Sequence, residues 1–351
     1  MKKILYSFLV LIGAVAFAAC DTDTENIGYK HKSSTDYAAI RAYRASDHEI
    51  MFGWFGNWDG GGASSAGSLM SLPDSLDMVS IWGSPWPLSD KQKADMNNVR
   101  KLKGTKILAC IFTPFLGRYL DLPEGVTPLE YYNWGTTQEE QIEAAREYGR
   151  DLAKKVIECG YDGLDIDNEP EQRDQPAHFY SVTAWFCAFI EGLGEYLGPE
   201  AGKGYILQVD GHMTTGMRAE MDKYIDYFVA QSYYSTTYTD LDSRFNTVAN
   251  FFSGTRAELA KKFMVTEDFE KYWTSGGMTS FRQRDGSYVS SGRGMAAWHP
   301  QENGEDLPKA GAGLYHIENE YRSTIKPYDC TRDMIQIMNP AVKPVEETPV
   351  P

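Results

Sequence analysis

The stretch YDGLDIDNEP, residues 161–170, does more than any other part of the chain to decide the fold. It follows a predicted helix and a glycine, and it reads as a β-strand with the loop after it. Side chains in a strand alternate between faces and each residue rises about 3.3 Å, so Asp165, Asp167 and Glu169 share one face at intervals of roughly 6.6 Å. The leucine and isoleucine between them face the other way, toward an apolar layer of helices.

Three carboxyl groups on one strand face indicate a site for acid–base catalysis. Burying acids side by side is costly unless they share protons or hydrogen bonds, and the crowding raises the pKa of at least one of them. A carboxyl group that keeps its proton near neutral pH suits general acid catalysis. Glu169 comes last on the strand, at the end where β/α barrels place their active sites, so we expect it to be the acid and Asp165 to lie deepest.

The rest of the chain alternates short β-rich runs with longer helical stretches. A capping box from Thr137 to Glu140 opens an amphipathic helix that ends near Cys159, and helical patterns also cover 177–197 and 331–338. This alternation predicts a parallel sheet, and eight strands favour an α/β fold with a single (β/α)8 TIM barrel. The predicted strands are Ile50–Phe55, Asp77–Trp82, Lys106–Phe112, Gly163–Asn168, Tyr205–Val209, Tyr227–Tyr233, Lys262–Glu267 and Gly313–Glu318.

The barrel is expected to be one domain, residues 37–339, followed by a Pro-rich tail at 340–351, because α/β barrels of this length form a single unit. A formal charge of −15 without a basic cluster argues against nucleic acid as a partner. The cysteines beyond position 20 lack the close spacing of zinc or redox motifs, so neither a metal nor a cofactor is expected. Whether those cysteines pair stays open.

The first 19 residues have the layout of a secretory signal peptide, with Lys2 and Lys3 before an uncharged stretch that is short for a membrane span. Residues 17–20, FAAC, resemble a bacterial lipobox, in which Cys20 is acylated; an ordinary signal peptide with an incidental cysteine is the alternative. The acidic run at 20–36 reads as a flexible tether. Together these features predict a secreted lipoprotein of the outer membrane, on the cell surface of a diderm bacterium.

Residues 162–169 match Asp-Gly-x-Asp-x-Asp-x-Glu, the signature of glycoside hydrolase family 18, at every defined position. The resemblance implies that Glu169 protonates the glycosidic oxygen while the substrate's own acetamido oxygen attacks the anomeric carbon, giving an oxazolinium intermediate that water opens. It also implies that Asp167 orients the acetamido N–H. Asp165, hydrogen-bonded to Asp167, would then control which of the two holds a proton.

A second match lies on the sixth predicted strand, where the family carries a tyrosine that holds the acetamido carbonyl. Tyr233 fits that tyrosine, and Gln231 shares its strand face. A Gln-x-Tyr arrangement resembles the family's endo-β-N-acetylglucosaminidases more than its chitinases, which tend to show Met-x-Tyr-Asp. The resemblance therefore implies cleavage in the N,N′-diacetylchitobiose core of N-glycans. The alternative is a polar pair that closes hydrogen bonds inside the barrel.

Several further residues are candidates for lining the substrate pocket because they lie near predicted strand ends or beside the acid. For any single aromatic residue, packing in the core is the competing interpretation. These weaker candidates for substrate binding are Trp54, Trp58, Asn168, Gln208, Asp210, Tyr234 and Trp298.

Other functions remain open at this point. A chitinase is the nearest variant, and a surface lipoprotein that binds glycans without cleaving them is an alternative of another class. The short Asp165-Ile166-Asp167 pattern also occurs in metal-dependent glycosyltransferases, and a carboxylate cluster binds Ca²⁺ or Mg²⁺ well. The expected partners are an N-acetylglucosamine-containing glycan or glycoprotein, a membrane reached through Cys20, and other glycan-uptake proteins.

Overall fold

The computed structural model describes residues 33–61 and 66–340. The predicted signal peptide, Cys20, most of the tether and the tail from 341 onward lie outside the described residues. The chain divides into two compact units, residues 1–39 and 40–351. In the first unit, Ser33 and Asp36 exchange capping hydrogen bonds that open helix α2 (Ser34–Arg44). Residues 34–36 are therefore helical and not part of a tether, because their polar side chains serve as a helix cap.

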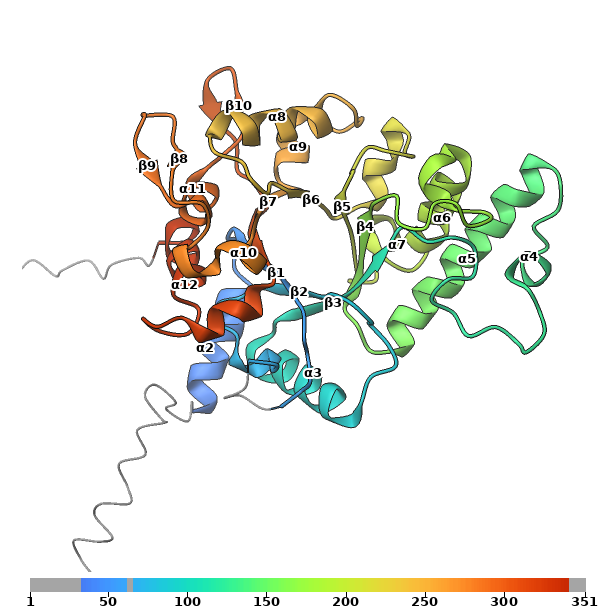
Figure 1. Cartoon of the computed structure of the whole chain (residues 1–351), viewed down its shortest axis with the longest axis horizontal. Helices are drawn as coiled ribbons and strands as arrows, with labels where there is room; N and C mark the ends of the chain where they lie inside the picture. The colour runs from blue at the N-terminus through green and yellow to red at the C-terminus, as the bar shows by residue number, and fades with distance from the viewer. Residues whose placement is uncertain (1–32, 62–65, 341–351) are drawn as a thin grey trace, which may run out of the picture. The chain divides into compact units, whose positions relative to one another are not determined.

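In the second unit, eight parallel strands close into a barrel in the order β1-β12-β7-β6-β5-β4-β3-β2, which confirms the predicted (β/α)8 fold (Figure 1). The barrel strands are β1 (Ile50–Phe55), β2 (Met78–Ile81), β3 (Lys106–Phe112), β4 (Gly163–Asn168), β5 (Ile206–Gly211), β6 (Tyr227–Gln231), β7 (Phe263–Asp268) and β12 (Gly311–Tyr315).

Helices surround the strands in Figure 1, and short elements fill the connections. The longer helices are α3 (Asp90–Lys103), α5 (Gln138–Glu158), α6 (Thr183–Gly194), α8 (Tyr238–Ala249), α11 (Ser291–Ala297) and α12 (Asp329–Met338). The shorter ones are α4 (Pro128–Tyr131), α7 (Gly198–Ala201), α9 (Arg256–Ala260) and α10 (Phe269–Tyr272), with 3₁₀ helices η2 (Leu69–Ser71), η3 (Phe179–Ser181), η4 (Ala219–Tyr224), η5 (Trp273–Ser275) and η6 (Ile317–Arg322). Two hairpins pair β8 (Phe281–Arg282) with β9 (Tyr288–Val289) and β10 (Gln301–Glu302) with β11 (Glu305–Asp306).

The predicted strand and helix limits fit best where the sequence carries a local signal. The capping box at Thr137 and Glu140 opens α5 as expected. The eighth strand starts at Gly311, two residues earlier than predicted. Glycine allows the strands to pack closely there, because a Cβ on Gly311 would collide with the backbone of Ile50 on β1. The helix predicted from residue 177 begins only at Thr183, after η3.

Side-chain alternation along the strands divides the core into two apolar layers. Leu164 and Ile166 lie in the layer between sheet and helices, whereas Asp165 and Asp167 are buried on the opposite face of β4. The barrel interior holds a second cluster: Phe52, Trp54, Met78, Leu108, Cys110, Val229, Met264 and Ala310. The predicted orientation of the acids on β4 is thereby confirmed.

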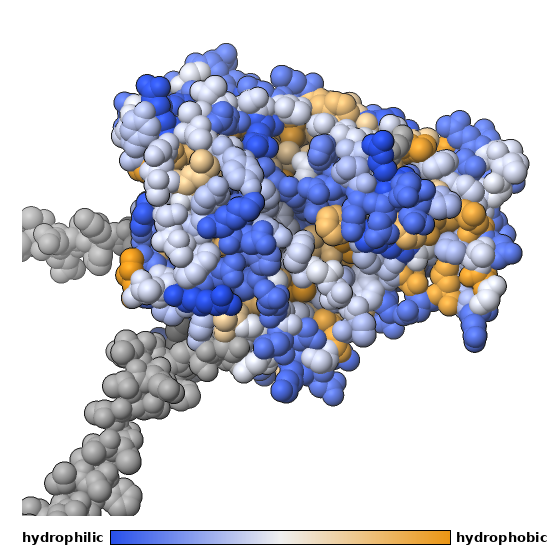
Figure 2. Space-filling model, viewed as in Figure 1, coloured by the Kyte–Doolittle hydropathy of each residue, from blue (hydrophilic) through white to orange (hydrophobic). Residues whose placement is uncertain are grey.

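The outer surface is polar over most of the face shown in Figure 2, with apolar side chains in smaller areas. Within the part of the chain that the structure describes, no helix is both long enough and apolar enough to cross a membrane. The cysteines in this part are free thiols: Cys110, Cys159, Cys187 and Cys330.

Candidate active site

A small cavity of about 180 Å³ holds the central residues of the candidate site. Both sequence motifs contribute to it, since Asp167 and Glu169 come from β4 and its end, and Gln231 and Tyr233 from β6 and its end. Such strand ends are where barrel enzymes place their active sites. The residues that line it are Trp54, Trp82, Phe112, Asp167, Glu169, Gln231, Tyr233 and Tyr315.

Asp165 lies below this cavity and is fully buried. Its Oδ2 accepts hydrogen bonds from Trp54 Nε1, at 2.8 Å, and from Ser80 Oγ, at 2.6 Å. Burial raises the pKa of Asp165, and these two donors oppose that rise. Among the described residues, no hydrogen bond joins Asp165 to Asp167, so that expectation is corrected. Asp165 lies instead close to Asp210 of the neighbouring strand β5, and the charge of Asp165 contributes to raising the pKa of Asp167.

Asp167 forms the acidic floor of the cavity. Its Oδ1 accepts a hydrogen bond of 3.3 Å from Gln231 Nε2. Burial raises the pKa of Asp167 to about 8, with further contributions from the charges of Glu169 and Asp165. Beside it, Gly211 has a φ of +70°, and a Cβ at that position would lie only 3.0 Å from Asp167 Oδ1. Glycine is needed there for both the backbone conformation and the close approach.

Glu169 is less deeply buried than the other two acids of the strand. Its backbone N–H donates to the carbonyl oxygen of Asp167 over 2.9 Å, which turns the chain at the end of β4. Its side chain reaches the cavity while remaining accessible from outside. A carboxyl group in this place can exchange a proton with a bound ligand and then with solvent.

An aromatic wall, made of Trp54, Trp82, Tyr233 and Tyr315, lines the same cavity. Tyr315 is central to it, with ring centroids 5.8 Å from both Trp82 and Tyr233 and 6.3 Å from Trp54. The Tyr233 hydroxyl makes no hydrogen bond to another described residue and is available to a ligand. Ring faces beside polar groups are typical of sites that bind sugars.

Sequence reasoning missed Trp82, Phe112 and Tyr315 as lining residues. The signal that could have found them is their position: each lies at or one residue beyond the carboxyl end of a barrel strand. The rule that these ends carry the active site applies to every strand, and not only to the two that bear motifs.

Two tryptophans predicted to line the pocket belong to the outer core. Trp298 is fully buried, and its Nε1 donates to Asp242 Oδ1 over 2.9 Å. Trp58 donates to Asp95 Oδ2, also over 2.9 Å. Both predictions are corrected, because these indole rings fill apolar space between sheet and helices and find hydrogen-bond partners there.

Three polar candidates also lie outside the cavity. Asn168 faces outward, where its Nδ2 donates to the carbonyl oxygens of His212 and Thr215 and so holds the loop after β5. Gln208 and Asp210 are fully buried on the inner face of β5, opposite Asp165 and Asp167 in register. None of the three contacts the cavity, so their prediction as pocket-lining residues is corrected.

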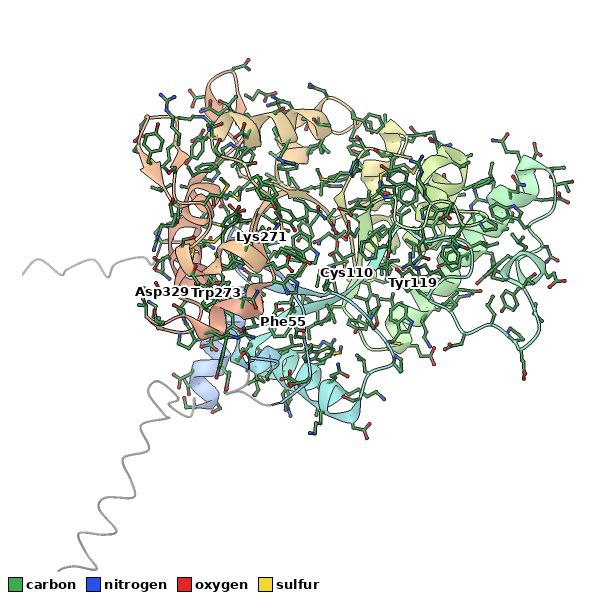
Figure 3. All side chains as sticks on the ribbon, viewed as in Figure 1. Phe55, Cys110, Tyr119, Lys271, Trp273 and Asp329 are labelled. Atoms are coloured by element: carbon green, nitrogen blue, oxygen red, sulfur yellow. The ribbon has the colours of Figure 1, made fainter. Side chains whose placement is uncertain are left out.

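Tyr234 lies next to the cavity residue Tyr233 but outside the cavity itself, with 53% of its surface exposed. Its hydroxyl accepts a hydrogen bond from Lys271 of α10, and the edge of its ring meets Tyr272. Figure 3 shows the positions of Lys271 on α10 and Cys110 on β3. Cys110 is one of the residues inside the barrel.

One buried group has the spacing of metal ligands: donor atoms of Cys110, Asp165 and Asp210 lie within 4.8 Å of one another. Its chemistry fits a resident cation poorly. The pKa of the Cys110 thiol is raised well above its usual range by burial, which keeps it protonated, whereas metals bind the thiolate. Hard cations prefer six or more oxygen ligands, and this group offers two carboxylates.

A closed parallel barrel with this acidic strand and this aromatic wall has the architecture of a glycoside hydrolase. The chain belongs to glycoside hydrolase family 18: the family model described as "Glycoside hydrolase family 18, BT1044-like" matches residues 21–337. It is a glycosidase of the endo-β-N-acetylglucosaminidase-like branch of that family.

Similar proteins support this assignment. The chain is 26% identical to endo-β-N-acetylglucosaminidase F2 of Elizabethkingia meningoseptica, over 97% of this chain and 100% of that protein. A solved structure of BT1044 in selenomethionine form is 28% identical, with a TM-score of 0.73 over 88% of this chain and 93% of that one. An endo-β-N-acetylglucosaminidase from Cordyceps militaris, at 19% identity and a TM-score of 0.61 over 89% and 98% of the two chains, shares the fold.

Proposed function

We propose that this enzyme cleaves the β-1,4 bond of the N,N′-diacetylchitobiose core of N-glycans by substrate-assisted retaining catalysis. The observation that carries the proposal is the composition of the cavity, in which Glu169 and Asp167 lie beside Gln231 and Tyr233. Its volume of about 180 Å³ is of the order of one sugar residue. An endoglycosidase similar over the full length supports this substrate class over chitin.

In the first step, protonated Glu169 gives its proton to the glycosidic oxygen as the bond from that oxygen to C1 breaks. The acetamido oxygen of the same sugar forms the new bond to C1, and an oxazolinium ion results. The Tyr233 hydroxyl donates to that acetamido oxygen and holds it below C1. This placement speeds the reaction because it holds the reacting atoms at attack distance before any bond forms.

Asp167 acts on the other end of the acetamido group. As positive charge develops on the oxazolinium N–H, the carboxylate of Asp167 accepts its hydrogen bond and stabilises the charge. The pKa of about 8 means that free Asp167 holds a proton near neutral pH, and the developing cation favours release of this proton from Asp167 to the solvent. Gln231 donates to Asp167 and keeps its carboxylate turned toward the substrate.

In the second step, water attacks C1 from the side that the leaving group vacated, and the carboxylate of Glu169 takes the proton of that water. The bond from C1 to the acetamido oxygen breaks, the acetamido group is restored, and the configuration at C1 is retained. Because the substrate supplies the nucleophile, the enzyme needs no second carboxylate about 5 Å from Glu169.

The test is to incubate the chain from Asp21 onward with glycoproteins that carry high-mannose or complex N-glycans, with chelator present. Mass spectrometry of the protein and of the released sugar should show a single N-acetylglucosamine left on each asparagine. Glu169→Gln should abolish this product. Glu171→Gln is the matched control, because Glu171 lies two residues away, is partly exposed, pairs with Arg118 and does not line the cavity.

Other products would assign the site differently. Short oligomers released from chitin, with glycoproteins untouched, would make the enzyme a chitinase. Glycan binding without cleavage would indicate a binding lipoprotein. Activity that chelator abolishes would support a metal-dependent transferase over a substrate-assisted hydrolase.

We also propose that the mature protein is anchored through an acylated Cys20 on the outer cell surface, where glycoprotein substrates and glycan-uptake proteins are accessible. The lipobox-like residues 17–20 and the acidic residues after them motivate this proposal. Labelling cells with a radioactive fatty acid should mark the wild-type protein. A Cys20→Ala variant should carry no label and should leave the membrane fraction.

A further inference from the structure

The inner face of β5 carries a carboxyl group, Asp210, that the reaction outlined above does not use. It is fully buried below the cavity and lies opposite Asp167 in the β4–β5 register. One of its oxygens lies within 4.8 Å of an oxygen of Asp165. Two buried carboxyl groups this close together cannot both be ionised without a large repulsion.

The hydrogen bonds around the two carboxyl groups leave one place where a shared proton fits. Asp165 Oδ2 already accepts from Trp54 and Ser80, and Asp210 Oδ1 accepts from Gln231 Nε2 over 2.8 Å. Asp165 Oδ1 and Asp210 Oδ2 have no N–H or hydroxyl donor among the described residues. A proton between the two carboxyl groups satisfies both oxygens.

The donors also decide which of the two acids keeps that proton. Two hydrogen bonds to one oxygen stabilise the charged form of Asp165, whereas Asp210 receives only one, from a neutral amide. We propose that Asp210 is a positioning residue that keeps its proton throughout the catalytic cycle: it donates to Asp165, accepts from Gln231, and through Gln231 holds Asp167 in place. Its catalytic consequence rests on the function proposed above.

The groups around Asp210 favour its neutral form. The titratable side chains that face it are Asp165 and Asp167 of β4, Cys110 of β3 and Tyr233 beyond β6, and none of these carries a positive charge. Burial, followed by the charges of Asp167 and Asp165, raises the pKa of Asp210 well above its usual range. A neutral Asp210 therefore limits the negative charge that the cluster must hold when Asp167 ionises.

Asparagine can reproduce the proposed state of Asp210. Its Nδ2 can donate to Asp165, and its Oδ1 can accept from Gln231, with nearly the same shape and no charge. Asp210→Asn should therefore keep kcat within about threefold of wild type, and its pH profile should superimpose on that of wild type. Asp210→Leu removes both hydrogen bonds and should lower kcat about 100-fold, as loss of one preorganised group does elsewhere.

The deciding experiment is infrared spectroscopy of the free enzyme in the carbonyl-stretch region, with D₂O to identify protonated carboxyl groups. Wild type should show such a band at about pH 9, above the Asp167 pKa of about 8, where Asp167 has released its own proton. Asp210→Asn should lose this band, and Asp167→Asn should keep it. The proposal would be overturned if the band persisted in Asp210→Asn. It would also be overturned if Asp210→Asn were as inactive as Asp210→Leu.

This experiment separates the two proposals. The infrared band is measured without substrate, so it reports the proton on Asp210 even if the chitobiose core is not cleaved. Conversely, an active enzyme without the band would leave the proposed function standing and remove the role of Asp210. If Asp210→Leu fails to fold, Asp210→Asn and the band still decide the question.

Discussion

The indole Nε1 of Trp54 donates a hydrogen bond of 2.8 Å to Oδ2 of Asp165 and so links β1 to β4 across the barrel interior. The two strands are not neighbours in the sheet, so this bond is a direct connection through the lumen. Ser80 of β2 adds a second donor to the same oxygen. The deepest acid of β4 is thus held by groups from two other strands, which stabilise its charged form.

Removing either donor should move the pH profile of the enzyme. Trp54→Phe deletes the N–H, and Ser80→Ala deletes the hydroxyl without touching the cavity. Each change raises the pKa of Asp165 further, because the charged form loses a hydrogen bond. The acidic limb of kcat against pH should therefore shift to higher pH in both variants, by about one pH unit or less. An unchanged profile in Ser80→Ala would contradict the role given to this acceptor.

The Tyr233 hydroxyl should matter for turnover more than for the fold. Tyr233→Phe should lower kcat about 100-fold, because the proposed donor to the acetamido oxygen is lost, while the ring contact with Tyr315 remains. The measurement is kcat on a defined N-glycopeptide, together with the melting temperature. Tyr234→Phe is the control, since this neighbouring hydroxyl lies outside the cavity and should cost little activity.

Substitutions of the cavity residue Trp82 and of the core residue Trp298 should affect KM and stability in opposite ways. Trp82→Ala removes a cavity wall and should raise KM about tenfold with little loss of stability, because Trp82 is partly exposed. Trp298→Phe should leave KM unchanged and reduce the free energy of unfolding by about 1–3 kcal/mol. It shrinks a fully buried ring and deprives Asp242 of a donor. Kinetics and urea denaturation on both variants would show whether the two effects separate in this way.

Stability should depend on pH through Asp210. Its pKa is raised in the folded protein, so above the ordinary aspartate pKa the unfolded chain releases a proton that the folded chain keeps. Wild type then loses stability as pH rises, by up to about 1.4 kcal/mol per pH unit for one such group, and Asp210→Asn does not. The variant should therefore gain in free energy of unfolding relative to wild type between about pH 5 and about pH 8 in urea titrations. A difference that stays constant over this range would show that Asp210 titrates normally.

Much of the fold and the centre of the site could be predicted because both rest on local patterns. Alternation along 163–168 placed Asp165 and Asp167 inside the barrel, and two short motifs brought Glu169 and Tyr233 to one cavity. The first relationship follows from strand geometry, and the second rests on the resemblance to the family's motifs as well.

The remaining site residues depend on contacts that no local pattern specifies. Asp210 was predicted to line the substrate pocket, but its depth follows from the β4–β5 register, which sets it level with Asp167. The positions of Trp58 and Trp298 depend on loops and helices that pack from outside the sheet. An aromatic residue near a strand end has the same local signal whether it points into a cavity or into the core.

The β4–β5 pairing also bears on how the protein reaches its native state. A slip of one residue in either strand would turn its acids toward the apolar helix layer and its leucine or isoleucine neighbours into the lumen. Uncompensated carboxylates in that layer would cost several kcal/mol each, far more than the hydrogen bonds between two misaligned strands would contribute. The acids that we propose for catalysis therefore also select the correct strand alignment, and a barrel assembled wrongly at this seam would be too unstable to persist.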